Sequence, residues 1–202
     1  MARPKRVIDP DAAYHVTSRG NNGRPHYVDD VDRRIFLRML ERAVERYDWL
    51  VRAFCLMTNH FHLVLQAPEG GPSLSKGMQE LNGGYSRTFN ARHRRRDHLR
   101  RNRFHAEPIE SESHLLEACR YVVLNPVRAG LCATPEAWQW SSYRATAGLG
   151  PSPGFLSAGW LVGLFSPDPA RACERYRAFV ADGTAVPPPA VVVESGAWRS
   201  PS

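Results

Sequence analysis

An α+β fold, in which helices pack on an antiparallel sheet, is predicted from three features of the 202-residue sequence. Short stretches rich in β-branched and aromatic residues, which are typical of strands, alternate with longer stretches of helical periodicity. Turn signals such as the run Arg-Gly-Asn-Asn-Gly at 19–23 separate these stretches. The hydrophobic fraction of 43% is enough for a real core, and the length favours one domain with an appendage.

The expected elements follow one another as strand, helix, strand, strand, helix, strand. Asp29 or Asp30 is a suitable N-cap for the first helix, and Gly83-Gly84 weaken the second helix without ending it. In chain order the six elements are expected over residues 12–18, 31–48, 51–57, 61–66, 74–94 and 104–110. Because this order is that of the ferredoxin-like arrangement, we expect a sheet of that type.

A further helix is expected after the fourth strand, over residues 113–125. Ser111 or Ser113 can cap its start, and its apolar residues share one face. Asn125-Pro126 is expected to end the helix, because the residue before a proline avoids the helical region.

The sequence divides into a main domain and a C-terminal extension. Residues 1–147 are expected to form the domain, with a loose basic arm at 1–10 and an aromatic-rich stretch at 131–147 that packs back on it. A short helical C-terminal extension is expected over 148–183, after a Gly/Pro linker. Residues 184–202 contain a triple proline and are expected to form a disordered tail.

Basic residues are in excess, and a formal net charge of +7 favours a polyanionic partner. Between residues 87 and 103, arginines are interleaved with aromatic residues and histidines, as in a groove that binds a DNA backbone and stacks bases. A solvated surface is the alternative interpretation of the same cluster. The candidate DNA-binding residues are Arg87, Arg92, Arg94, Arg95, Arg96, Arg100, Arg101 and Arg103.

Other classes of protein are not favoured by the composition. The four cysteines show no Cys-x-x-Cys spacing, so neither a zinc ribbon nor a disulfide framework is indicated. The first residues lack the apolar segment of a signal peptide, and no apolar run reaches transmembrane length. We therefore expect a cytoplasmic protein that associates with the nucleoid and has no membrane contact.

The motif His60-Phe61-His62 lies at the start of the strand predicted over 61–66, with His60 directly before it. Because side chains alternate along a strand, both imidazoles project from the same face, where they could chelate a divalent metal. An ordinary pair of histidines on a half-buried strand is the alternative, since so short a motif is weak by itself.

Tyr121 and Asn125 lie one helical turn apart, on the border of the apolar face of the 113–125 helix. If this border lies over the sheet face that bears the histidines, the phenol, both imidazoles and the amide oxygen converge. A metal on these ligands could polarise a phosphodiester while the phenol attacks phosphorus. A helix-border aromatic and an asparagine before a proline are the ordinary alternatives.

Tyr85 is the main rival nucleophile, since it also lies on a predicted helix with Asn90 nearby. Its neighbour one turn on is Phe89, which cannot ligate a metal, so core packing explains Tyr85 better. His15 and His105 could approach the site, but the sequence pattern does not place them there.

Three motifs occur in an order that is much more specific than His-x-His alone. They are His60-Phe61-His62, the run Arg-Tyr-Val-Val-Leu-Asn-Pro-Val-Arg-Ala-Gly at 120–130, and Trp-Ser-Ser-Tyr at 140–143. Together they resemble the REP-associated tyrosine transposases, which belong to the single-tyrosine HUH transposase superfamily. The resemblance spans about residues 10–147.

The resemblance implies a ferredoxin-like or RRM-like sheet, with His60 and His62 as metal ligands and Tyr121 as the nucleophile. Asn125 would correspond to the polar third ligand. The implied metal is Mg²⁺ or Mn²⁺, and the implied substrate is single-stranded DNA, often folded as a hairpin. Cleavage would leave a 5′-phosphotyrosine and a free 3′-hydroxyl, and the protein would act as a monomer or homodimer.

The resemblance is incomplete at residues 97–103. Where relatives commonly have Gly-His-Leu-aromatic-Gln-Gly-Arg, this chain has Asp-His-Leu-Arg-Arg-Asn-Arg. The departure leaves the catalytic set intact but leaves the DNA specificity open. Two classes of function therefore remain, a DNA strand-cleaving and rejoining enzyme or a non-catalytic RRM-like nucleic-acid-binding regulator. The intact Tyr121 and both histidines favour the enzyme.

Overall fold

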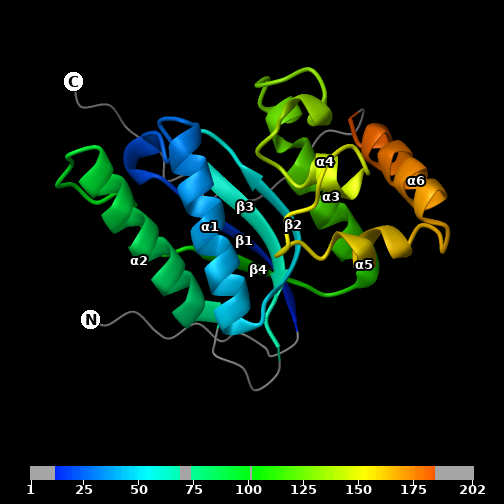
Figure 1. Ribbon diagram of the computed structural model, residues 1–202, viewed down its shortest axis with the longest axis horizontal. Helices are drawn as coiled ribbons and strands as arrows, with labels where there is room; N and C mark the ends of the chain where they lie inside the picture. The colour runs from blue at the N-terminus through cyan, green and yellow to red at the C-terminus, as the bar shows by residue number, and fades with distance from the viewer. Residues whose placement is uncertain (1–11, 69–73, 101, 185–202) are drawn as a thin grey trace, which may run out of the picture.

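The computed structural model describes residues 12–68, 74–100 and 102–184 (Figure 1). The predicted basic arm at 1–10 lies outside these residues. So do Arg101 and, apart from its first residue, the tail predicted over 184–202. None of the helices in the described parts of the chain is both long and apolar enough to cross a membrane.

A four-stranded sheet lies at the centre of the fold, with the strand order β2-β3-β1-β4 and antiparallel pairing throughout. The strands are β1 (Ala13–Arg19), β2 (Leu50–Leu56), β3 (His60–Gln66) and β4 (His105–Ile109). Their order along the chain and in the sheet confirms the predicted ferredoxin-like α+β fold.

Helices cover both faces of this sheet (Figure 1). Asp29 caps the first helix as predicted, because its side chain accepts a hydrogen bond from the backbone N–H of Asp32 at 3.1 Å. The helices are α1 (Asp30–Tyr47), α2 (Leu74–Arg92), α3 (Glu112–Arg128), α4 (Tyr143–Thr146), α5 (Ala158–Gly163) and α6 (Pro169–Asp182). Short 3-10 helices span Asn21–Gly23 and Pro135–Ala137.

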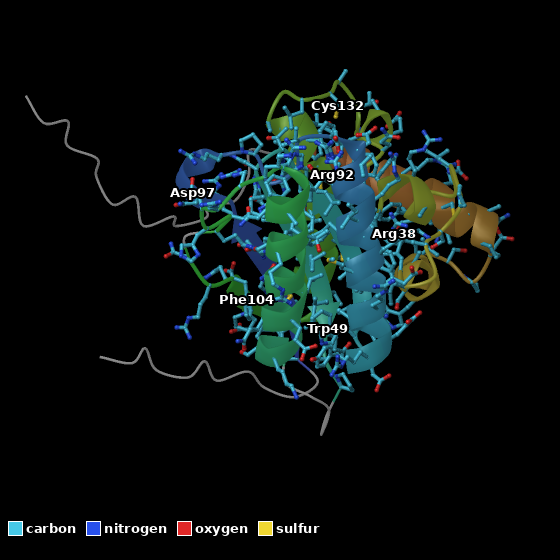
Figure 2. All side chains as sticks on the ribbon, turned by 60° about the vertical axis from the view of Figure 1, so that its left-hand side comes forward. Arg38, Trp49, Arg92, Asp97, Phe104 and Cys132 are labelled. Atoms are coloured by element: carbon cyan, nitrogen blue, oxygen red, sulfur yellow. The ribbon has the colours of Figure 1, made fainter. Side chains whose placement is uncertain are left out.

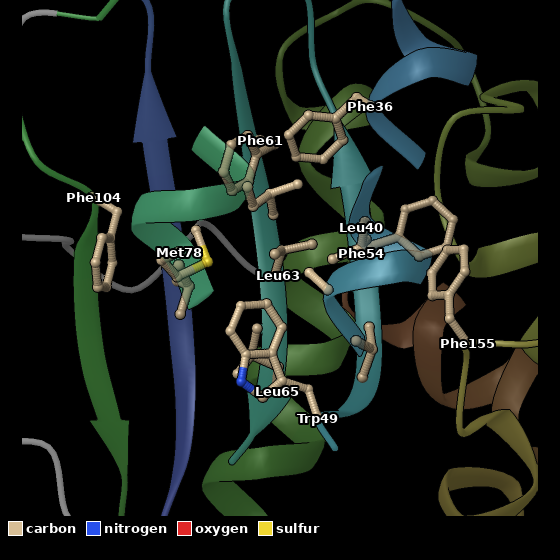
Figure 3. Close-up of a cluster of buried hydrophobic side chains, with 14 of the residues drawn as sticks. Phe36, Leu40, Trp49, Phe54, Phe61, Leu63, Leu65, Met78, Phe104 and Phe155 are labelled. Atoms are coloured by element: carbon tan, nitrogen blue, oxygen red, sulfur yellow. The ribbon is translucent and has the colours of Figure 1, made fainter. Parts of the chain in front are cut away.

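The larger hydrophobic core lies between the sheet and the helices α1 and α2. Alternate residues of β3, Phe61, Leu63 and Leu65, project into it and are fully buried (Figure 3). Phe36 of α1 packs against Phe61, with their ring centroids 4.8 Å apart. Met78 brings α2 into the same core (Figure 3). Because side chains alternate along β3, the residues on its other face contact different neighbours.

The second core lies on the opposite face of the sheet, beneath α3. Val64 of β3 packs there with Cys119, Val122 and Val123 of the helix, all of them buried. His60 and His62 share this face with Val64, because side chains two residues apart on a strand point the same way. The apolar face of α3 thus brings its border residues over the two histidines.

Helix α3 does not end at Asn125, as the sequence suggested, but continues through Pro126 to Arg128. A proline inside a helix removes one backbone hydrogen bond and crowds the preceding turn. The helix nevertheless re-forms its bonding at once, since the N–H of Ala129 donates to the Asn125 carbonyl at 2.9 Å. Pro126 is buried. Burial of its ring favours the helical continuation that local preference opposes.

The aromatic-rich stretch at 131–147 packs back on the domain along the edge of β2. The backbone N–H of Leu56 donates to the Trp140 carbonyl at 2.8 Å, and the indole N–H of Trp138 donates to the Leu56 carbonyl at 3.1 Å. The N–H of Ser142 donates to the Phe54 carbonyl at 2.9 Å. These bonds satisfy backbone groups that an open sheet edge would expose.

The predicted helical extension contains the two helices α5 and α6. Tyr176 and Val180 of α6 are buried in the second core, beside α3. The division of the chain into a domain and an extension stays a prediction, since the extension shares this core.

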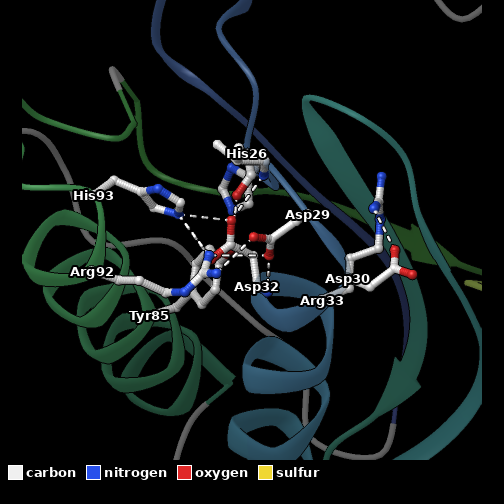
Figure 4. A network of polar contacts seen from close by, with 9 residues as sticks. His26, Asp29, Asp30, Asp32, Arg33, Tyr85, Arg92 and His93 are labelled. Atoms are coloured by element: carbon white, nitrogen blue, oxygen red, sulfur yellow. Dashed lines mark hydrogen bonds and ion pairs between the residues drawn. The ribbon is translucent and has the colours of Figure 1, made fainter.

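A network of polar contacts ties the start of α1 to the end of α2, where Arg92 lies (Figure 2), and its members are drawn in Figure 4. The Arg92 guanidinium donates to Asp32 at 2.7 Å and to Asp29 at 2.6 Å. The buried Asp32 carboxylate also contacts Nε2 of His93 at 2.9 Å and accepts from the N–H of Val28 at 2.8 Å. The network therefore joins two helices that are distant in sequence.

We expect Asp32→Ala to lower the free energy of unfolding by about 2–3 kcal/mol, because its partners lose the buried carboxylate that accepts their hydrogen bonds. Asp30→Ala is the matched control, since the Asp30 carboxylate is half exposed and, in the part of the chain that the structure describes, its one ion pair is with Arg33 of the same helix. This control should cost less than about 1 kcal/mol. Urea denaturation of both variants measures the difference, and equal losses would contradict a structural role for the network.

Candidate active site

His60 and His62 lie side by side on the β3 face that is covered by α3. Their ring centroids are 4.9 Å apart, and the rings meet edge to face. His62 is buried and His60 is partly buried. The strand alternation predicted for this motif is therefore present, and the two imidazoles face the same space.

The ring of His60 is oriented by its neighbour in the chain. The side-chain oxygen of Asn59 lies 2.7 Å from Nδ1 of His60, so it accepts the proton on that nitrogen. A neutral imidazole carries only one such proton, which leaves the lone pair of Nε2 free. This arrangement, with Nδ1–H held by an oxygen, is the one found behind metal-binding histidines.

The ring of His62 is oriented by His15 of β1. Nδ1 of His62 lies 2.9 Å from Nε2 of His15, and the two rings stack with their centroids 5.1 Å apart. Nε2 of His62 is buried and has no hydrogen-bond partner among the described residues. If Nδ1 donates to His15, the unpartnered Nε2 presents a lone pair, so the site fits a metal ion.

Burial keeps all three imidazoles neutral. Desolvation lowers the pKa of His60 to about 4, with a smaller contribution from the charge of Arg19. Desolvation also lowers the pKa of His15 to about 4, and it holds the pKa of His62 well below its ordinary value. Because only a neutral imidazole can ligate a metal, the histidines are in the binding form at neutral pH.

Tyr121 lies over these histidines. Its ring centroid is 5.8 Å from that of His62 and 5.7 Å from that of His15, with edge-to-face geometry in both cases. The guanidinium of Arg128, two helical turns further on, lies 5.4 Å from the centre of the Tyr121 ring. The border of α3 therefore lies on the histidine face, as the convergence hypothesis required.

Asn125 lies one turn beyond Tyr121. Its side-chain N–H donates to the Tyr121 carbonyl at 2.9 Å, which leaves the amide oxygen available as a ligand. Within the described ranges, no hydrogen bond joins Asn125 to either histidine. In the same ranges, no group of three or more His, Cys, Asp or Glu residues could hold a metal ion. A metal on the two histidines would therefore need an oxygen ligand such as that of Asn125.

The comparison with protein families now decides the class of this chain. The family model described as "Transposase IS200 like" matches residues 10–124, more than half of the sequence. The chain belongs to the IS200-like transposase family. The match covers β1 to β4 and most of α3, including both histidines and Tyr121, and it agrees with the resemblance carried by the motifs.

Two similar proteins have names that are more specific than the description of the family. A Haemophilus influenzae protein, whose name assigns it provisionally to the REP-associated tyrosine transposases, is 23% identical over 117 residues. That alignment covers 54% of this chain and 66%, just under two thirds, of the relative. A solved structure described as a REP-associated tyrosine transposase bound to a REP hairpin matches with a TM-score of 0.64 at 17% identity. It covers 78% of this chain and 96% of that chain, and it confirms the fold.

The sequence did not predict the position of three residues that lie at the candidate site, His15, Arg19 and Arg128. His15 and Arg19 lie on the same face of β1, and Arg19 pairs in register with His60. Arg128 follows Tyr121 by seven residues, which brings it to the same side of a helix. That spacing could have identified Arg128, but the helix was expected to end at Asn125, which left Arg128 outside it.

Tyr85 is not part of the candidate site. Its ring is fully buried in the larger core, and its hydroxyl donates to the His26 carbonyl at 2.7 Å. Burial raises the pKa of Tyr85 far above its ordinary value, which makes the phenol a poor nucleophile. His105 is exposed on β4. Core packing therefore accounts for Tyr85, as predicted.

The predicted DNA-binding arginines fall into distinct environments. Arg92 is engaged with Asp29 and Asp32, and Arg100 is partly buried beside α2, where it bonds to Ser86. Arg95 is partly buried, with its guanidinium 5.6 Å from the centre of the Phe89 ring. Arg92 is exposed in spite of its ion pairs, and Arg87, Arg94, Arg96 and Arg103 are exposed as well. DNA binding by the cluster stays a prediction, with the exposed members as its best candidates.

Proposed function

We propose that this protein is a metal-dependent transposase that cleaves and rejoins single-stranded DNA through a 5′-phosphotyrosine intermediate. The observation that carries the proposal is the position of Tyr121, whose ring meets His62 and His15 directly over the His60-Phe61-His62 strand. Membership of the transposase family supports the same conclusion. Tyr121 would be the nucleophile, and His60, His62 and Asn125 would hold the metal.

The proposed reaction exchanges one phosphate ester for another. The phenol oxygen of Tyr121 gives up its proton and attacks phosphorus, and the bond from phosphorus to the 3′ oxygen breaks. That oxygen takes up a proton to become a hydroxyl, so no proton is consumed overall. The 5′ end is then joined to the tyrosine, so the bond energy is retained and a 3′-hydroxyl can reverse the step. Bound Mg²⁺ or Mn²⁺ would supply Lewis-acid polarisation of the phosphate. The exposed Arg19 beside His60 would help to hold the anionic backbone.

A folded REP-like DNA hairpin is the substrate that we propose. The solved relative is described as bound to a REP hairpin, and the H. influenzae relative carries a REP-associated name. The net charge of +7 and the exposed arginines at the end of α2 suit a polyanion. Binding should therefore weaken steeply as the salt concentration rises.

The proposal is tested with the full-length protein, Mn²⁺ or Mg²⁺, and single-stranded hairpin DNA labelled separately at each end. Hairpins are taken from short palindromic repeats that flank the coding region. We expect a covalent complex that retains the label on the 5′ end of the cleaved product and survives denaturation. Tight, salt-sensitive binding with no adduct in either metal would instead favour the non-catalytic nucleic-acid-binding regulator.

Arg128 is expected to position the nucleophile. Its Nη2 donates to the Gly183 carbonyl at 3.1 Å, so the end of α6 holds the guanidinium against the Tyr121 ring. Arg128→Ala should slow adduct formation by about 10- to 100-fold, because a misplaced reacting group loses the preorganised geometry.

The matched control for Arg128 is Arg120→Ala. Arg120 also binds the end of α6, where it donates to the Phe179 carbonyl at 3.3 Å, but it is not stacked on Tyr121. Single-turnover rates of adduct formation and DNA affinity are measured for both variants. Equal slowing by the two variants would show that loss of the α6 contact, and not the stacking on Tyr121, is responsible.

A further inference from the structure

The turn between β2 and β3 is held by the segment that joins β1 to α1. The Thr58 carbonyl in this turn accepts a hydrogen bond from the backbone N–H of His26 at 2.9 Å. The next carbonyl, that of Asn59, accepts from the N–H of Gly20 at 2.8 Å. The two residues that precede His60 are therefore fixed to a segment that is distant from them in the sequence.

The loop of residues 20–24 is held in one shape by its own hydrogen bonds and by a neighbouring segment. The N–H of Asn21 donates to the Leu99 carbonyl at 2.9 Å, and the N–H of Arg24 donates to the Asn21 carbonyl at 3.1 Å. Gly23 has a φ of +69°, a conformation that glycine adopts without strain. The Gly23 carbonyl therefore has a defined position beside the turn.

The amide side chain of Asn59 lies between this loop and the first histidine. Its Nδ2 donates to the Gly23 carbonyl at 3.3 Å, and its Oδ1 lies 2.7 Å from Nδ1 of His60. Because a carbonyl can only accept, the N–H end of the amide must face Gly23. The oxygen end is then turned toward His60, so Nδ1 of that ring carries the proton. The loop therefore acts on the imidazole through Asn59.

The second histidine is not constrained in the same way. Nδ1 of His62 faces Nε2 of His15 at 2.9 Å, and either nitrogen can be the donor. Both assignments form the same hydrogen bond, so this contact alone does not determine where the proton of His62 lies. Asn59, in contrast, offers His60 only an acceptor. Of the two histidines, His60 is therefore the one whose proton position is set by its neighbour.

The position of this proton matters for metal binding. Nε2 of His60 can ligate a metal only through its lone pair, so a proton on Nε2 would first have to move to the other nitrogen. With Nδ1–H held by Asn59, Nε2 presents its lone pair before a metal arrives. A ligand that is already in its binding form lowers the free energy cost of binding.

We propose that Asn59, held by the loop of residues 20–24, is a positioning residue that fixes His60 in its metal-binding tautomer. The proposal rests on the proposed function, because it takes His60 to be a metal ligand. It gives a role in the metal site to a loop that lies outside the proposed ligand set. Anchoring of the turn alone is the alternative role of Asn59, and the two roles depend on opposite ends of the same amide.

The test compares Asn59→Ala with Asn59→Asp in the full chain. Alanine removes both contacts, whereas aspartate loses the donor to Gly23 but keeps an acceptor for His60. Asn90→Ala is the matched control, because the Asn90 amide donates to the backbone carbonyl of Asp97 at 2.8 Å, in another loop.

Two measurements are made on each variant. Nitrogen-15 NMR of the metal-free protein at neutral pH shows which nitrogen of His60 carries the proton. The signals of this ring are identified by their loss in His60→Ala. Isothermal titration then gives the affinity for Mn²⁺ alone.

We expect the proton on Nδ1 of His60 in the parent, in Asn90→Ala and in Asn59→Asp. Asn59→Ala should move the proton, at least in part, to Nε2 and weaken Mn²⁺ binding by about 10- to 100-fold. Asn59→Asp should keep the Mn²⁺ affinity of the parent or increase it, because a carboxylate behind a ligating histidine raises the basicity of the ring.

Equal losses of Mn²⁺ affinity in Asn59→Asp and Asn59→Ala would overturn the proposal in favour of turn anchoring. A proton on Nε2 of His60 in the parent would also overturn it, as would an unchanged tautomer and affinity in Asn59→Ala. Neither measurement uses DNA. A protein that shows the expected effects but never forms an adduct would therefore contradict only the proposed function.

Discussion

Tyr121→Phe is expected to abolish the covalent protein–DNA adduct, with adduct formation reduced by at least about a thousandfold. The substitution removes only the hydroxyl oxygen that would bond to phosphorus. The ring can still meet the edges of His62 and His15, so the fold and DNA binding should be retained. Denaturing gels with labelled hairpin DNA measure the adduct, and anisotropy measures binding.

Tyr85→Phe is the control for this experiment. It removes a hydroxyl of the same kind from the larger core, where the hydroxyl donates to the His26 carbonyl. The variant should lose about 1 kcal/mol of stability and still form the adduct at close to the normal level. Undiminished adduct in Tyr121→Phe would show that another group is the nucleophile.

His60→Ala and His62→Ala are expected to remove metal-dependent cleavage, each by at least about a hundredfold, because each deletes a proposed ligand. Isothermal titration with Mn²⁺ provides a readout that does not depend on activity, and both variants should lose the binding heat. His15→Ala should weaken Mn²⁺ binding by about 10- to 100-fold, since it leaves the ligand ring of His62 unsupported.

His105→Ala is the matched control for the histidine variants. His105 is exposed on β4, and it contributes only a charge effect that lowers the pKa of His15. Its loss should change Mn²⁺ affinity by less than about threefold. The ligand assignment fails if His60→Ala and His62→Ala retain both the binding heat and the cleavage rate.

Much of the fold could be predicted from periodicity because each element has a single apolar pattern. The alternation in β3 predicts that Phe61 and Leu63 share one face while His60 and His62 share the other. The helical spacing in α3 places Tyr121 on the border of the face that carries Val122. These two patterns were enough to bring a phenol and two imidazoles together as a hypothesis.

Long-range contacts account for what periodicity missed. His15 reaches His62 only because β1 lies between β3 and β4, a pairing that no local pattern contains. Pro126 continues a helix because tertiary burial outweighs a local backbone preference. Arg92 and Arg100 belong to the same arginine cluster in the sequence. Among the described residues, however, Arg92 meets two carboxylates and Arg100 meets none.

The sequence alone determines which functional groups this chain carries and which of them can share a face, because that depends on residue types and their spacing. The partnerships of those groups depend on the tertiary structure. Hydrogen bonds and charge pairs act over a few ångströms, so only the folded chain decides which nitrogen of His62 is left free and which ring Arg128 covers. The sequence alone was therefore enough to propose Tyr121 as the nucleophile, whereas the positions of His15 and Arg128 beside it required the fold.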